Sequence, residues 1–88
     1  MRELTLETLE YFSRVEWSTP DDFMVAVRCY PRPCAYSWLR RLNRNGLLKR
    51  SLDYRGRIQY QLGAHGARRL LYLKQRKAYN GGHENLSR

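Results

Sequence analysis

Side chains that can bind an anion or read a base gather on one predicted helix, which spans residues 33–45. They are Tyr36, Ser37, Arg40, Arg41 and Arg44. A guanidinium group can hold guanine O6 and N7 with two hydrogen bonds, or it can grip a phosphate. No acidic residue falls on this face of the sequence pattern, whereas an ordinary solvated helix face, which is the alternative, mixes both signs of charge. The pattern therefore favours a helix that lies in the major groove of a nucleic acid.

A predicted β-hairpin follows this helix and carries a second group of such side chains. They are Lys49 and Arg50 on the first strand, and Tyr54, Arg55 and Arg57 at the tip. We expect the tip, residues 53–57, to reach an adjacent minor groove or a phosphate. The other interpretation is that glycine and charged residues are common in any hairpin turn and have no binding role here. Turn chemistry alone favours neither interpretation.

The two signs of charge are sorted along the chain. Residues 1–27 hold two arginines against six acidic residues, a formal charge of −4. Residues 28–88 hold fifteen Lys and Arg against two acidic residues, a formal charge of +13. A basic segment of this kind suits a polyanion, so nucleic acid is the first partner to consider.

Few residues could support catalysis or bind a metal. His65 and His83 are isolated, and their spacing from Cys29 and Cys34 matches no zinc finger or zinc ribbon. We therefore expect no enzyme activity, no metal and no cofactor. A disulfide between the two cysteines is geometrically possible but rare in a reducing cytosol. Two small apolar residues near a turn are the simpler interpretation.

The length of 88 residues fits one domain with a single core, and a hydrophobic content of 42% favours a folded chain. We place the domain at residues 1–78 and expect residues 79–88, which show no periodicity, to form a disordered tail. No apolar run approaches the roughly 18 residues that cross a bilayer, and the first residues lack the layout of a signal peptide. The expected location is the cytoplasm.

Hydrophobic periodicity and helix-breaking residues predict an α+β domain that is mainly α. Helices are predicted over residues 5–15, 20–28, 33–45 and 64–77, and strands over 47–52 and 58–62. The boundaries rest on a hydroxyl cap before Pro20, on Pro31 and Pro33, and on Gly46 after the third helix. The side chains expected to face the core are Leu6, Leu9, Phe12, Val15, Trp17, Phe23, Val27, Ala35, Trp38, Leu39, Leu42, Ile58, Tyr60, Leu62, Ala67, Leu70 and Leu71.

The order helix, helix, turn, helix, hairpin and helix resembles a winged helix-turn-helix domain. Residues 34–50 are similar to the recognition-helix pattern of that superfamily at Ala35, Leu39, Leu42, Gly46, Leu47 and Leu48. Residues 60–70 resemble the junction between the wing and the last helix in MarR-type and PadR-type regulators, although Gly63 replaces the usual Thr or Ser cap. The resemblance covers about residues 5–77. It implies a three-helix core, a two- or three-stranded β-wing and a C-terminal helix.

Together with the charge, this resemblance implies a double-stranded DNA-binding protein, most simply a small transcriptional regulator. It also implies a homodimer, for which Tyr72 and Leu73 on the last helix offer surplus apolar surface. The main alternative is a protein-interaction module within a larger assembly, because winged helices also dock proteins. RNA binding would fit the charge, but the sequence lacks the aromatic platform of single-strand binders.

Overall fold

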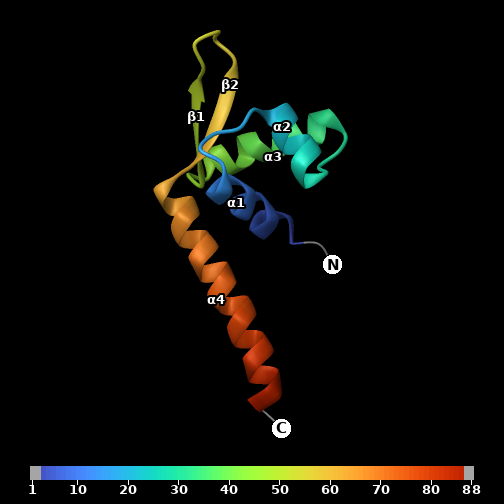
Figure 1. Ribbon diagram of the computed structural model, residues 1–88, viewed down its shortest axis with the longest axis vertical. Helices are drawn as coiled ribbons and strands as arrows, with labels where there is room; N and C mark the ends of the chain where they lie inside the picture. Colours follow the sequence, from blue (N-terminus) through green and yellow to red (C-terminus); the bar gives the residue numbers. More distant parts are fainter. Residues whose placement is uncertain (1–2, 87–88) are drawn as a thin grey trace.

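The computed structural model describes residues 3–86, and it describes the side chains of residues 3–76. Helices and a two-stranded antiparallel hairpin follow one another along the chain (Figure 1). Their bounds are α1 (Leu4–Arg14), α2 (Pro20–Val27), α3 (Arg32–Arg44), β1 (Leu48–Leu52), β2 (Ile58–Leu62) and α4 (Ala64–Leu86). Every predicted element is present, and the predicted class, α+β and mainly α, is confirmed. Only the end of α4 differs from the prediction by more than one residue.

The core lies where α1, α2 and α3 meet. Leu9, Phe12, Phe23 and Leu39 are fully buried, and the rings of Phe12 and Phe23 stack with their centroids 5.9 Å apart. Burial of a side chain of this size contributes roughly 1.5–3 kcal/mol to stability. Phe12 and Phe23 therefore join α1 to α2, and Leu39 packs α3 into the same core.

The two tryptophans are less buried than predicted. Trp17 is 45% exposed, because it follows the end of α1 and no helical stripe turns it inward. Trp38 is partly buried beside the core, and its indole N–H donates a 2.9 Å hydrogen bond to Thr8 Oγ1. Since Thr8 is itself buried, this bond ties α3 to α1.

Hydroxyl and proline residues set the helix-turn-helix formed by α2 and α3. Thr19 Oγ1 accepts a 3.2 Å hydrogen bond from the N–H of Asp22, and Pro20 is the first residue of α2, as predicted. The chain leaves α2 through Arg28, whose φ of 60° is left-handed. α3 then begins at Arg32, between two prolines that prevent α2 from continuing.

The end of α3 is closed by a Schellman motif. Gly46 has a φ of +81°, as the sequence predicts for the residue after the helix. Its N–H donates to the carbonyl of Asn43, and the N–H of Leu47 donates to the carbonyl of Leu42, both at 3.0 Å. Leu42 and Leu47 are both buried, so the turn from α3 into β1 is fixed by packing as well.

β1 and β2 pair from Leu48↔Leu62 at the base to Leu52↔Ile58 at the tip, and we call them, with the residues 53–57 that join them, the wing. The backbone of Ser18 adds a third, one-residue strand through two hydrogen bonds to Tyr60, of 2.9 and 2.8 Å. Tyr60 is buried, but Ile58 is 37% exposed. The prediction that Ile58 is buried is wrong, because the outer end of the wing extends beyond the helices.

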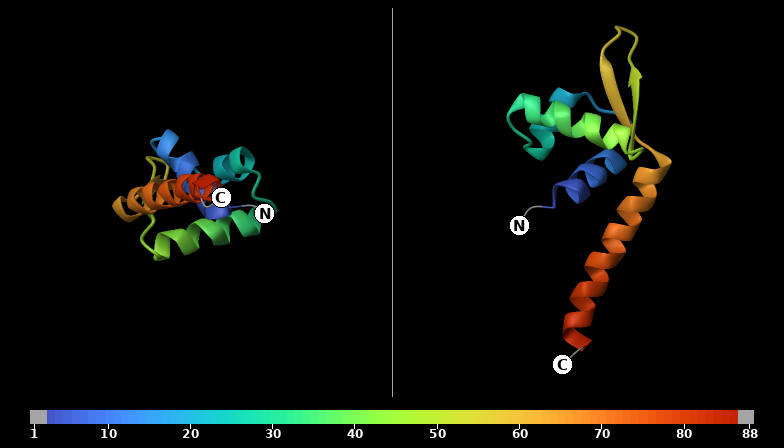
Figure 2. Two further views of the ribbon diagram at one scale, coloured as in Figure 1. Left: turned by 90° about the horizontal axis from the view of Figure 1, so that it is seen from below. Right: turned by 180° about the vertical axis from the view of Figure 1, so that it is seen from behind.

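α4 begins at Ala64, as predicted, and projects away from the other elements (Figures 1 and 2). Leu70 is buried and Leu73 packs against the core, whereas Ala67 and Leu71 are exposed. The predictions that Ala67 and Leu71 face the core are therefore wrong. Leu73, which the sequence pattern places outside, faces inward.

The rotation of α4 is set by Gly66 in its first turn. A Cβ atom on Gly66 would collide with the carbonyl oxygen of Leu47 and would lie 2.8 Å from Leu62 Cδ1. Because this side of α4 touches the backbone between α3 and β1, Leu70 and Leu73, one and two turns further along, face the domain too. The hydrophobic pattern of the sequence alone does not predict the contact between Gly66 and the backbone of Leu47.

α4 continues to Leu86, past its predicted end at Lys77. The side chains of residues 77–88 lie outside the described part of the chain. The predicted boundary between a domain at residues 1–78 and a disordered tail at residues 79–88 stays a prediction. In the part of the chain that is described, no helix is both long enough and apolar enough to span a membrane.

Candidate nucleic-acid interface

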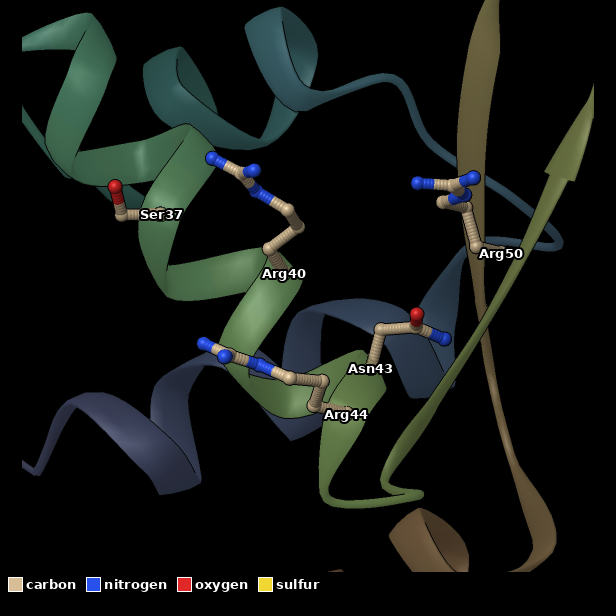
Figure 3. A pocket seen from close by; sticks show the side chains of 5 residues that line it. All are labelled: Ser37, Arg40, Asn43, Arg44 and Arg50. Carbon is tan, nitrogen blue, oxygen red and sulfur yellow. The ribbon is translucent and has the colours of Figure 1, made fainter.

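A groove lies between α3 and the wing. Its cavity has a volume of about 440 Å³ and is lined by Ser37, Arg40, Asn43, Arg44 and Arg50. The side chains from α3 lie on one side of this space, and Arg50 of β1 lies on the other (Figure 3). We call it the arginine groove.

The buried side of α3 determines which residues reach the groove. Ala35, Leu39 and Leu42 are buried against the core, so Ser37, Arg40 and Arg44 point away from it. Arg41 is exposed but does not line the groove. Arg41 lies about 100° around the helix from Arg40, on the flank that faces away from the wing.

Strand alternation separates the two basic residues of β1. Leu48 is buried, and Arg50 shares its face of the strand, opposite Tyr60 of β2. Lys49 pairs with Gln61 on the other face, away from α3. The structure therefore brings Arg50, but not Lys49, to the residues of α3. The sequence signal that could have distinguished Lys49 from Arg50 is the apolar Leu48, because a strand places residues 48 and 50 on the same face.

Asn43 belongs to the groove, although the sequence did not single it out. Its side-chain N–H donates a 2.8 Å hydrogen bond to the carbonyl of Leu48. This bond joins the last turn of α3 to the start of β1. Asn43 thus fixes the angle between the basic side chains of α3 and the wing. Its position one turn after Arg40 is the sequence signal that could have suggested this role.

The guanidinium groups of the groove are not neutralised. Among the described residues, no ion pair or hydrogen bond engages the side chains of Arg40, Arg44 and Arg50. Like charges that converge on one groove repel one another, and an anion relieves that repulsion. The groove can therefore accommodate phosphate groups or the acceptor atoms of guanine.

Tyr36 lies at the edge of this surface with its hydroxyl already engaged. The hydroxyl donates a 3.2 Å hydrogen bond to Asp21 Oδ1, and Arg32 Nε lies 3.3 Å from the same oxygen. Burial raises the pKa of Tyr36, and the hydrogen bond to Asp21 raises it further. The phenol therefore stays protonated and can contact a base or sugar only with its ring or as part of this cluster.

The tip of the wing is organised around Asp53. Its Oδ1 accepts hydrogen bonds from the backbone N–H groups of Arg55 (2.8 Å) and Arg57 (2.9 Å), and its Oδ2 pairs with Arg57 Nε at 3.0 Å. The guanidinium of Arg55 lies over the ring of Tyr54, 5.4 Å from its centroid, and Tyr54 is 88% exposed. Arg57 is thus bound to Asp53, whereas the side chains of Tyr54 and Arg55 are exposed.

Protonation of Asp53 is expected to loosen the tip only below pH 3.8. The backbone N–H of Arg57 is the main cause that lowers the pKa of Asp53 below its ordinary value of 3.8. The stabilisation from these bonds is complete above that value and is lost as the pH falls through the lowered pKa. The amide resonances of Arg55 and Arg57 should follow this titration in NMR spectra, and Asp53→Asn should abolish it. A midpoint at or above 3.8 would contradict the geometry.

The cysteines and histidines form no cluster in the described part of the chain. Cys29 is buried and Cys34 is exposed, and neither forms a disulfide in the described part of the chain. Within residues 3–76, no three side chains of His, Cys, Asp or Glu gather to hold a metal ion. His65 is exposed in the first turn of α4, and the side chain of His83 lies outside the described residues.

Neither a protein-family model nor a curated protein sequence matches this chain. Solved structures do match it. MepR, a transcription regulator from Staphylococcus aureus, has a TM-score of 0.76 at 20% identity, over 99% of this chain and 64% of that one. A MarR variant from E. coli, complexed with operator DNA, has a TM-score of 0.79 at 15% identity, over 96% of this chain and 61% of that one. The transcriptional regulator YodB from B. subtilis has a TM-score of 0.74 at 10% identity, over 89% of this chain and 78% of that one.

The chain therefore has the winged helix-turn-helix fold, as the sequence predicts. In this fold α2 and α3 form the helix-turn-helix, β1 and β2 form the wing, and α3 stands where the recognition helix does. The chain spans about three fifths of the length of the MepR and MarR chains that it matches.

Proposed function

We propose that this protein is a transcriptional regulator that binds double-stranded DNA and has no catalytic role. α3 lies in the major groove, and residues 53–57 of the wing lie on the adjacent minor groove or on the backbone. The observation that carries this proposal is the convergence of Arg40, Arg44 and Arg50, without a neutralising partner among the described residues, in one groove beside α3. Similar structures of a MarR variant with operator DNA, and of a MepR variant with an oligodeoxyribonucleotide, support it.

The geometry suggests a division of roles along the interface. Ser37, Arg40 and Arg44 project from the outer face of α3, so they can reach base edges. Arg50 faces them from the wing and suits a backbone phosphate. The remaining proposed contacts are Tyr36 and Arg41 on α3, Lys49 on β1, and Tyr54, Arg55 and Arg57 at the tip.

Removal of two guanidinium groups from α3 should weaken DNA binding without unfolding the domain. The variant Arg40→Ala/Arg44→Ala is expected to lose about 10- to 100-fold in affinity for duplex DNA, because each arginine supplies a charge-assisted contact. Its free energy of unfolding should stay within about 1 kcal/mol of the parent, since both side chains are exposed. Fluorescence anisotropy and thermal unfolding measure the two effects.

The matched control is Arg68→Ala/Arg69→Ala, which removes the same charge from exposed positions on α4 outside the arginine groove. If both double variants lose the same affinity, net charge and not the groove determines binding. Equal affinity of Arg40→Ala/Arg44→Ala and the parent would exclude α3 as the reader.

We also propose that two copies associate through α4. Leu71 is 57% exposed and Tyr72 is 55% exposed on this helix, whereas Leu73, the other residue expected there, packs against its own core. A dimer would let two recognition helices enter major-groove segments about 34 Å apart. Sedimentation equilibrium should show a dimer for the parent and a monomer for Leu71→Glu/Tyr72→Glu. A monomeric parent at high micromolar concentration would exclude this assembly.

A further inference from the structure

The outer end of the wing has a polar face and an apolar face. On the polar face, Gln59 Nε2 donates a 3.1 Å hydrogen bond to Ser51 Oγ. On the apolar face, Leu52 and Ile58 lie directly opposite each other. Leu52 is 62% exposed and Ile58 is 37% exposed, so the helices leave this face partly uncovered. Two neighbouring aliphatic side chains in water gain free energy when an apolar partner covers them.

The apolar face of the wing continues to the ring of Tyr36 on α3. Tyr36 and Ile58 line a cavity of about 170 Å³, which Arg40 and Arg50 also line, and a second cavity of about 380 Å³. Since the Tyr36 hydroxyl is already hydrogen-bonded, its ring is the part of this side chain that a partner can cover. We call the surface formed by Tyr36, Leu52 and Ile58 the apolar pad.

Cations flank the apolar pad on both sides. Arg40 and Arg50 join it to the arginine groove, and the exposed Arg55 lies beyond it at the tip of the wing. The carboxylate of Asp21, which lines the second cavity, is paired with Arg32. A sugar–phosphate strand alternates in the same way, because sugars that present C–H groups separate its charged phosphates. The surface therefore suits such a strand.

The proposed docking on DNA brings a strand to the apolar pad. In that docking, α3 lies in a major groove and residues 53–57 lie on the adjacent minor groove or on the backbone. One sugar–phosphate strand separates a major groove from the adjacent minor groove. Because the apolar pad lies between α3 and the tip, it meets the sugars of that strand.

We propose that the apolar pad binds the deoxyribose sugars of this strand and thereby favours DNA over RNA. The inference rests on the proposed DNA-binding function. The C2′ atom of deoxyribose carries only hydrogens, whereas that of ribose carries a hydroxyl that donates and accepts hydrogen bonds. Aliphatic side chains offer this hydroxyl no partner, so a ribose on the pad loses hydrogen bonds to water.

The first test compares Leu52→Thr with Val25→Thr in a salt series with a random-sequence DNA duplex. Val25 is a matched control, because it is 61% exposed and lines none of the three cavities. Leu52→Thr should bind about two- to fivefold more weakly than the parent, since apolar contact is lost. Its salt slope should equal that of the parent, because no phosphate contact is removed. Val25→Thr should match the parent in both respects.

The second test changes the sugar. Three duplexes of one sequence carry deoxyribose, ribose or 2′-fluoro-deoxyribose at alternate nucleotides of both strands. The fluoro sugar adopts a ribose-like shape without an O–H group, so it separates the effect of shape from that of the hydroxyl. The parent should bind the fluoro duplex about fivefold more tightly than the ribose duplex. This preference should shrink in Leu52→Thr, whose hydroxyl can pair with ribose, and persist in Val25→Thr.

Two results would overturn the inference while the parent still binds DNA. One is a Leu52→Thr variant that binds DNA as tightly as Val25→Thr or has a smaller salt slope than the parent. The other is a preference for the fluoro duplex that is missing in the parent or unchanged in Leu52→Thr. Circular dichroism of Leu52→Thr checks that the domain is folded, as expected for an exposed strand position. If the parent shows no salt-dependent binding, the proposed function fails and the inference falls with it.

Discussion

Replacing Gly66 with alanine is expected to destabilise the domain by about 3 kcal/mol, a large part of the stability of a chain this size. The new Cβ atom would collide with the carbonyl oxygen of Leu47, which belongs to the backbone and cannot rotate away. α4 would have to move off the turn between α3 and β1, and with it Leu70 would leave the core. Chemical denaturation of the variant and the parent measures the loss.

The matched control for this prediction is Ala67→Gly, on the exposed side of the same turn of α4. At an ordinary helical position, alanine is more stable than glycine by roughly 0.5–1 kcal/mol. Ala67→Gly should therefore lose about that amount. Gly66→Ala would gain it if no contact opposed the methyl group, and a more stable Gly66→Ala variant would show that α4 does not dock through Gly66.

Replacing Leu39 with alanine should cost about 2–5 kcal/mol. Leu39 is completely buried on the inner side of α3, so the truncation leaves a cavity between α3 and the first two helices. We expect loss of DNA binding at 37 °C through unfolding, because a domain this small has little stability to spare. Thermal unfolding followed by circular dichroism measures the change.

Leu52→Ala is the control for Leu39→Ala. Leu52 lies at the outer end of β1 and is 62% exposed, so its truncation should change the free energy of unfolding by no more than about 0.5 kcal/mol. Similar losses for the two variants would mean that α3 is not packed as the structure has it.

The elements could be predicted from the sequence because prolines and a glycine mark where the helices begin and end. Pro20 starts α2, Pro31 lies between α2 and α3, Pro33 lies in the first turn of α3, and Gly46 supplies the left-handed residue that closes α3. Between these points the apolar residues repeat with a clear helical or strand period. Where period and punctuation agree, local chemistry alone sets the boundaries.

The orientation of α4 could not be predicted, because its sequence holds leucine at positions 70, 71 and 73, with apolar residues on several sides. The contact between Gly66 and the backbone of Leu47 joins residues far apart in the chain, and it selects Leu70 and Leu73 as the inner residues. A hydrophobic period of about 3.6 residues identifies an amphipathic helix. When several faces of the helix are apolar, tertiary contacts determine which face packs against the core.

The candidate site was predictable on α3 for the same reason and less so on the wing. The buried stripe of Ala35, Leu39 and Leu42 determines which side of α3 carries Arg40 and Arg44. The pairing of Tyr36 and Arg32 with Asp21 depends on how α2 and α3 cross, which no local pattern encodes. The sequence therefore predicts which side chains lie on the outer face of α3, but it does not predict which acidic residue lies next to Tyr36 and Arg32.

The measurement that tests the central claim most directly is the affinity of the parent for a random-sequence duplex across a salt series, by fluorescence anisotropy. The logarithm of the affinity should fall linearly with the logarithm of salt, with a slope of several units at about −0.9 per phosphate contact. Arg40→Glu/Arg44→Glu, measured in the same series, should abolish binding. No binding by the parent at low salt, or an affinity that does not respond to salt or to the charge reversal, would contradict the claim that the arginine groove binds DNA.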